Sequence, residues 1–179
     1  MCEGPVRVTC PSAPMPRFLL PVCLATLALV LAGCDSVGLH APPATAAVRP
    51  WPEMLAAVNA VRAEAQTCGG AAVAAAPPLV WNDRLGDAAR AHAADMLATD
   101  RLAHVGSDGS DPGDRATRAG YAWRVVAENI ARHQRTVPEV VEDWLASPGH
   151  CRTLMDARVA EMGAAKEGAY WTQLFGLSR

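Results

Sequence analysis

The chain has 179 residues, of which 51% are hydrophobic, and its formal net charge is −2. This length suits one ordinary domain with a leader and is too short for two domains. The sequence has no basic cluster of the kind that electrostatic binding of nucleic acid needs, so we expect no nucleic-acid partner.

The N-terminal segment has the pattern of an export signal. A basic start at residues 15–17 (Met-Pro-Arg) is followed by an apolar run over residues 18–32 and then by Gly33-Cys34. A run this short, ending in small residues, predicts a signal peptide rather than a permanent membrane span. We therefore expect residues 1–33 to form a leader, with the signal peptide at 15–33.

The end of this leader, Leu-Ala-Gly-Cys34, resembles the lipobox of bacterial lipoproteins. In that family the cysteine receives diacylglycerol, the leader is cut before it, and the new N-terminus is acylated. The resemblance implies a membrane partner through lipid on Cys34 and a place in the cell envelope, facing the periplasm or the exterior, on either membrane. The alternative is a soluble secreted protein whose leader happens to hold a cysteine. Either Met1 or Met15 is the initiator.

Residues 35–50 are rich in Ala and Pro, carry few charges and lack the apolar periodicity of a packed element. We therefore expect residues 34–50 to form a lipidated flexible tether and residues 51–179 to form the domain.

The mature chain keeps two cysteines besides Cys34, namely Cys68 and Cys151. An even pair in an oxidising compartment predicts one disulfide. Two free thiols, or thiolate chemistry at Cys151, are the alternatives.

Two helices are expected in the first half of the domain. Pro52 suits a first helical position, and apolar residues at helical spacing predict a helix that Cys68-Gly69-Gly70 stops. A second helix is capped by Asn82 or Asp83 and ends near Thr99. The first apolar stripe is Met54, Leu55, Val58, Val61 and Ala65, and the second is Leu85, Ala89, His92 and Met96. His92 therefore lies on a buried face, where we expect a hydrogen-bonded core histidine rather than a ligand.

A turn-rich loop occupies residues 104–114. Its acidic residues Asp108, Asp111 and Asp114 recur at every third position, whereas a calcium loop of the EF-hand kind needs every second. We interpret them as solvated turn residues. Asp114 can cap a short helix that ends at Gly120.

The second half of the domain predicts three strands and two helices. Residues 123–132 alternate like a strand. Thr136-Val-Pro-Glu139 fits a capping box for a helix that extends to Leu145, and Ser147 is expected to cap another short helix. Strands are expected at about 159–166 and 170–175. The order of elements predicts the α+β class, with antiparallel strands covered by helices.

Glu128 is the residue whose position most needs a partner. It lies between Val126 and Ile130 on one face of the predicted strand, where a carboxylate is costly to bury without a donor. His104 and His150 lie at the edges of loops and caps and are candidate partners, but their spacing does not show that they converge.

Five segments resemble the CAP domains of cysteine-rich secretory proteins, venom allergens and plant pathogenesis-related proteins. They occur in family order and span about Trp51 to Gly176. The similarity is greatest to the bacterial branch. The resemblance implies a three-layer α-β-α sandwich with a small antiparallel sheet. The segments are Asn59-Ala-Val-Arg62, His104 with its Gly-Ser-Asp-Gly loop, Glu128-Asn-Ile-Ala131, Trp144-Leu-Ala-Ser-Pro-Gly-His150 and Tyr170-Trp-Thr-Gln173.

Members of this family typically present two histidines and two glutamates in a cleft, sometimes with a divalent metal. His104 and Glu128 match the first histidine and the first glutamate. The second glutamate position is Ser147 here and the second histidine position is Tyr170, so half of that set is absent. His150 is a feature of the bacterial branch that can enter the same cleft. The pairing of the two domain cysteines also resembles that branch.

The leading hypothesis is a monomeric, non-catalytic envelope module. It would bind a small lipid-like ligand or an envelope protein near His104, Glu128 and His150, with Ser147 and Tyr170 as further cleft candidates. The family has been associated with sterols, lipids and other proteins, although a fold does not fix a function. The first alternative is a purely structural brace of the same His and Glu residues.

The second alternative is a metal-dependent hydrolase, in which His104, Glu128 and His150 would hold a divalent metal with an open fourth position. No HExxH-like spacing supports it, and we expect neither a cofactor nor an enzymatic activity. A cysteine hydrolase built on His150 and Cys151 is disfavoured, because adjacent helical residues point about 100° apart.

Overall fold

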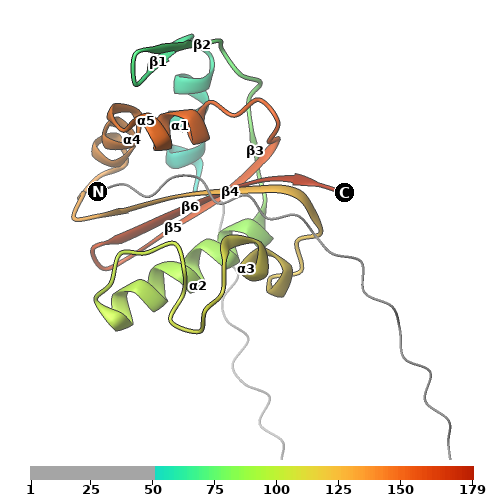
Figure 1. Cartoon of the computed structure of the whole chain (residues 1–179), viewed down its shortest axis with the longest axis vertical. Coiled ribbons are helices and arrows are strands. Elements are labelled where there is room, and N and C mark those ends of the chain that lie inside the picture. The colour runs from blue at the N-terminus through green and yellow to red at the C-terminus, as the bar shows by residue number, and fades with distance from the viewer. Residues whose placement is uncertain (1–50) are drawn as a thin grey trace, which may run out of the picture. The chain divides into compact units, whose positions relative to one another are not determined.

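A four-stranded sheet forms the centre of the domain in this computed structural model, which describes residues 51–179 (Figure 1). The strand order is β3-β5-β6-β4, so β4 lies at a free edge. Strands β4, β6 and β5 are antiparallel, and the two-residue β3 adds one parallel pairing to β5. The strands are β3 (Val80–Trp81), β4 (Trp123–Arg132), β5 (Glu161–Glu167) and β6 (Tyr170–Ser178).

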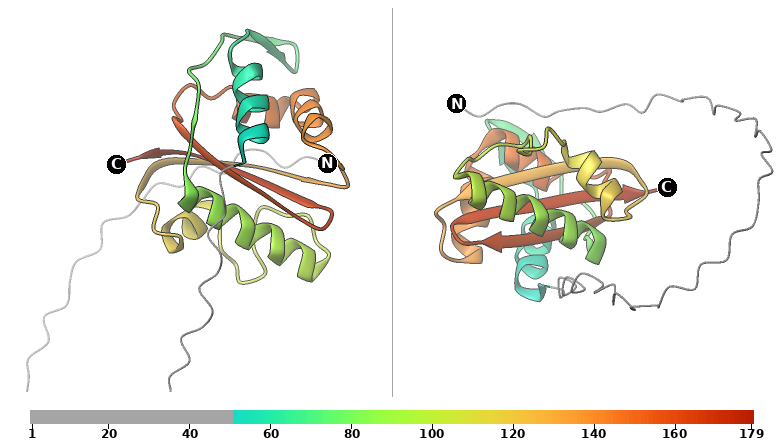
Figure 2. Two further views of the ribbon diagram at one scale, coloured as in Figure 1. Left: turned by 180° about the vertical axis from the view of Figure 1, so that it is seen from behind. Right: turned by 90° about the horizontal axis from the view of Figure 1, so that it is seen from below.

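Helices cover both faces of the sheet (Figures 1 and 2). Helices α2 (Asp83–Thr99) and α3 (Pro112–Arg118) lie on one face. Helices α1 (Pro52–Arg62), α4 (Val137–Ala146) and α5 (Pro148–Leu154) lie on the other. This arrangement confirms the predicted α+β class and the three-layer α-β-α sandwich. The predicted leader, the lipidation site Cys34 and the tether lie outside the described residues.

Alternation along the strands divides the core between the two helical layers. Leu174 of β6 packs with Leu85 and Ala89 of α2, whereas its neighbour Phe175 packs in the larger cluster with Val58 of α1 and Trp144 of α4. Helix α2 approaches β5 very closely at Gly163, where an added Cβ would lie 2.0 Å from the backbone nitrogen of Gly86. A glycine at this position lets the helix lie flat on the sheet.

The first helix is shorter than predicted, because it ends at Arg62 rather than at the Cys68-Gly69-Gly70 segment. The intervening chain forms a hairpin of β1 (Gln66–Cys68) and β2 (Ala71–Val73). Gly69 and Gly70 have φ of 63° and 84°, as a two-residue type I′ turn requires. The two glycines are therefore a hairpin turn and not a helix stop.

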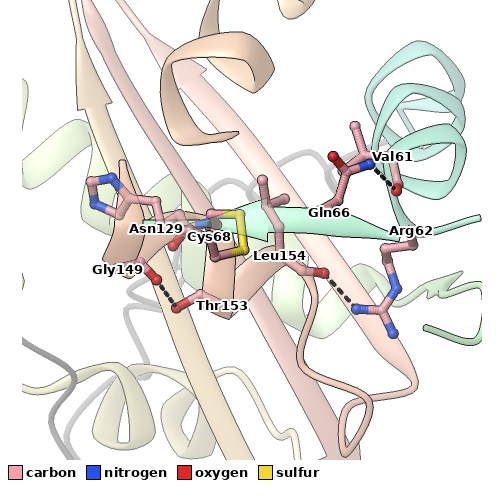
Figure 3. Close-up of a disulfide and its surroundings, with 10 residues drawn as sticks. Val61, Arg62, Gln66, Cys68, Asn129, Gly149, Thr153 and Leu154 are labelled. Atoms are coloured by element: carbon pink, nitrogen blue, oxygen red, sulfur yellow. Dashed lines mark hydrogen bonds between the residues drawn. A yellow bond between two sulfur atoms is a disulfide. The ribbon is translucent and has the colours of Figure 1, made fainter. Parts of the chain in front are cut away.

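The hairpin places Cys68 beside Cys151 of α5, and the two residues form a disulfide between Cα atoms 5.5 Å apart (Figure 3). Both cysteines are buried. The predicted pairing is confirmed, and the two alternatives, free thiols and thiolate chemistry at Cys151, are excluded.

Helix starts follow the predicted caps in two cases and differ in two. Asn82 accepts hydrogen bonds at the start of α2, and Thr136 does so at the start of α4, as predicted. The cap of α3 is Asp111 rather than Asp114, which completes the capping box from the third helical position. Ser147 holds the cap position of α5, but its side chain makes no capping hydrogen bond. Within residues 51–179, no helix has the length and apolarity to cross a membrane.

Candidate functional site

Glu128 lies in the second half of the edge strand β4, opposite Leu174 of β6. Because Leu174 packs against α2, the Glu128 side chain points into the layer of α2 and α3. The residue is 8% exposed, but its side chain is only 1% exposed. The predicted burial of this carboxylate is therefore confirmed.

Both carboxylate oxygens of Glu128 have donors. His104 Nδ1 lies 2.8 Å from Oε1, and Arg115 Nη2 donates to Oε2 over 2.7 Å. A carboxylate paired with a guanidinium only accepts hydrogen bonds, so His104 Nδ1 carries the hydrogen. The His104 side chain is 29% exposed. Glu128 therefore fixes the orientation of an imidazole whose other nitrogen, Nε2, is not engaged by the carboxylate.

Arg115 is the site residue that the sequence reasoning missed. It lies on α3 with a side chain 5% exposed, and it also donates to the backbone carbonyls of Ser110, over 2.8 Å, and His104, over 3.0 Å. The guanidinium thereby joins both ends of the 104–110 loop to strand β4. The available signal was physical: a carboxylate on an apolar strand face needs a cation, and Arg115 lies only 13 residues away.

His92 of α2 lies beneath the same carboxylate. Its Nε2 is 2.9 Å from the carbonyl of Ala103 and 3.8 Å from Glu128 Oε1. Burial lowers the pKa of His92, and the negative charge of Glu128 opposes this only in part. The prediction of a hydrogen-bonded core histidine is confirmed.

His150 reaches the same strand from the opposite layer. Its backbone carbonyl, at the start of α5, accepts a 3.3 Å hydrogen bond from Asn129, which neighbours Glu128 but points to the other face of the sheet. Burial lowers the pKa of His150, and the nearby His104 lowers it further. The two predicted histidines therefore lie near each other across the edge of β4. Of these two histidines, only His104 forms a hydrogen bond with Glu128 within residues 51–179.

The other two candidate residues form no hydrogen bond with the carboxylate within residues 51–179. Ser147 is half-buried, three residues before His150. The Tyr170 hydroxyl donates to Asp100 Oδ1 over 2.8 Å, at the C-terminal end of α2, and the Arg132 guanidinium lies 4.7 Å from the centre of its ring. The structure thus uses Tyr170 to join α2 to the sheet.

The residues present do not fit a divalent metal. One oxygen of Glu128 is held by a guanidinium, and a cation at that place would be repelled by Arg115. The tyrosine and serine at the other two family positions are not brought to Glu128. The part of the chain that the structure describes contains no group of three or more His, Cys, Asp or Glu residues arranged to hold a metal.

A surface pocket of about 210 Å³ borders the His104 loop on the α2 side. It includes Ala103 and Val105, the two chain neighbours of His104, and Val105 is 51% exposed. The hollow therefore lies beside the histidine pair rather than between its members. Its full lining is Asp95, Met96, Thr99, Arg101, Ala103, Val105 and Ser107.

Comparison with known proteins identifies relatives of this domain. The model of the family described as "CAP: Cysteine-rich secretory protein family" matches residues 55–175. The uncharacterized protein YkwD of Bacillus subtilis is 31% identical over 100 residues, which cover 55% of this chain and 39% of YkwD. The uncharacterized membrane protein YlbC of the same organism is 29% identical over 97 residues, covering 54% of this chain and 28% of YlbC. The match thus spans well under half the length of either relative.

Solved structures show the same fold. An extracellular protein containing a SCP domain from Bacillus anthracis superposes with a TM-score of 0.55 at 27% identity, over 56% of this chain and 34% of its own. An outer surface protein from Borrelia burgdorferi superposes with a TM-score of 0.54 at 21% identity, over 58% of this chain and 80% of its own.

Proposed function

Since the chain belongs to the CAP (cysteine-rich secretory protein) family, we propose that it is a non-catalytic binding module of the cell envelope. Its binding surface is the edge of β4 where His104 and His150 lie together. The occupant is a small lipid-like ligand or an envelope protein, and the module works as a monomer. Lipid on Cys34 anchors it to a membrane.

The observation that carries this proposal is the contrast between buried, paired side chains and a partly exposed imidazole at this site. Glu128 and Arg115 are buried and take up each other's charge, while the 29% exposed imidazole of His104 stands at the surface. The side chain of His150 forms no hydrogen bond within residues 51–179, and burial lowers its pKa. The imidazole of His104, which Glu128 orients, and the imidazole of the nearby His150 offer hydrogen bonds to an external partner.

The same contacts disfavour both alternatives. A purely structural role explains the positions of His104, Glu128 and Arg115, but it does not explain the position of His150. A metal-dependent hydrolase needs a carboxylate free to bind the ion or to move a proton, and the Glu128 carboxylate is held between Arg115 and His104.

An envelope location is supported by the relatives, among which are an extracellular protein and an outer surface protein. It is also supported by the disulfide, because such bonds persist in oxidising compartments. The anchoring step rests on the lipobox-like sequence at Cys34.

Site-specific photo-crosslinking in living cells tests the proposal. A photoreactive amino acid replaces Ser147, whose side chain makes no capping bond, and a control carries it at the exposed residue Ala65, which lies between α1 and β1. We expect an adduct from position 147 and none from position 65. His150→Ala should lower the yield at position 147 without changing the free energy of unfolding.

An absence of adduct at position 147 would contradict the binding proposal and favour the brace. Titration of the purified protein with zinc addresses the hydrolase separately. If the wild type binds stoichiometric zinc and Glu128→Gln does not, the metal-dependent hydrolase is favoured over the binding module.

A further inference from the structure

We infer that the partner is a polypeptide, and that one extended segment of it adds as a fifth strand to the free edge of β4 beside Val126 and Glu128. This inference rests on the proposed function and names the class of partner. The segment passes between His104 on one side of the edge and His150 on the other.

The register of the sheet determines which backbone groups of β4 face outward. His133 donates its backbone N–H to Ala169, directly beyond the Arg132–Tyr170 pair, so the odd-numbered residues of β4 bond to β6. From Val126 to Arg132, beyond the register shift between Trp123 and Val125, the even-numbered residues therefore turn their N–H and C=O groups to the free edge. The hydrogen bond from Trp144 Nε1 to the Ile130 carbonyl, 3.2 Å long, agrees with this.

The outward backbone groups of Val126 and Glu128 have no partner among residues 51–179. The exposure of Glu128 also indicates that its backbone is accessible at the free edge. The whole residue is 8% exposed while its side chain is 1% exposed, so its accessible surface lies mainly on the main chain. Trp144 covers the edge at Ile130, and the open stretch therefore lies toward the start of the strand.

A row of alternating N–H and C=O groups is complementary to another extended backbone, as in strand addition to exposed sheet edges. A lipid chain cannot pair with these groups, because it has neither donors nor acceptors at that spacing. A second copy of this chain would have to bring its own edge, bordered by its own His104 and His150, to the strand spacing of about 4.8 Å. A single extended segment fits this place best.

The test removes one outward donor and leaves the sheet intact. Proline is tolerated on an edge strand where its nitrogen faces away from the neighbouring strand, as at Val126. Val126→Pro is compared with the matched control Val126→Ala, which loses side-chain packing and keeps the N–H. A photoreactive amino acid replaces the exposed Arg124, two residues before Val126, and adducts formed in cells are sequenced by mass spectrometry.

We expect a polypeptide adduct from position 124 that survives Val126→Ala. In Val126→Pro its yield should fall by about tenfold or more, because a hydrogen bond is lost and the ring blocks the edge. In the adduct, hydrogen exchange of the Val126 and Glu128 amides should slow relative to the unmodified protein. Because this exchange measurement does not use the proline variant, it tests the inference even if that variant does not fold.

An adduct that is a lipid or a second copy of this chain, an undiminished yield in Val126→Pro, or unchanged exchange at both amides would overturn the inference. An adduct at position 147 with none at position 124 would also overturn it and leave the proposed function standing. No adduct at either position would contradict both.

Discussion

Glu128→Ala removes a carboxylate that accepts from two side chains and leaves Arg115 buried and unpaired. The Arg115 side chain is 5% exposed, so water cannot replace the lost partner fully. Removing one member of a buried ion pair costs about 3–5 kcal/mol. Glu128→Gln keeps the volume and one acceptor oxygen and should cost about 2 kcal/mol. Urea denaturation with the disulfide intact measures both free energies of unfolding.

The exposed pair Arg118–Asp108 provides the control. Its side chains are 59% and 52% exposed, and Arg118→Met should therefore cost less than about 1 kcal/mol. If Glu128→Ala costs no more than this control, or if the Gln variant is as unstable as the Ala variant, the assignment of Glu128 as a buried, doubly bonded anchor is wrong.

Three further predictions concern the disulfide, the anchor and the response to acid. Replacing Cys68 and Cys151 by serine should cost roughly 4 kcal/mol on a chain-entropy basis, and alkylation of either thiol in the native protein would contradict the bond. Cys34→Ala should leave the membrane fraction or remain unprocessed, whereas a soluble wild type with its N-terminus beyond Cys34 would refute lipidation. Burial lowers the pKa values of His92 and His150 from 6.5, so below that pH the unfolded chain binds more protons. The melting temperature should therefore fall from pH 7 to pH 5, and an equal or higher value at pH 5 would contradict the burial of these neutral rings.

The parts of the fold that depend on local patterns were predictable from the sequence. Period-two alternation located β4, and a carboxylate on its apolar face marked Glu128 as a group that needs a donor. The cap of α2 at Asn82 was predictable for the same reason, because a single side chain bonds to backbone groups two and three residues away.

The sequence-based predictions were wrong or incomplete in two situations. In one, a local sequence pattern fits two different structures; in the other, a residue's surroundings depend on how a helix packs on the sheet. Gly69-Gly70 suits both a helix stop and a type I′ turn, and only the partner strand β2 decides between them. Arg115 lies on a short helix, where an arginine is usually solvated, and its burial depends on how α3 docks onto β4. His150 was a candidate partner of Glu128, and sequence spacing does not reveal that its helix α5 covers the opposite face of the sheet.

Histidine side-chain NMR of the protein during titration with native envelope extract tests the binding surface most directly. We expect the ring signals of His104 and His150 to shift together, while those of the exposed His133, beyond the C-terminal end of β4, stay in place. We also expect His150→Ala to abolish the shift of His104. Unmoved His104 and His150 signals at saturating extract, or equal shifts at all three rings, would contradict a binding site at the edge of β4.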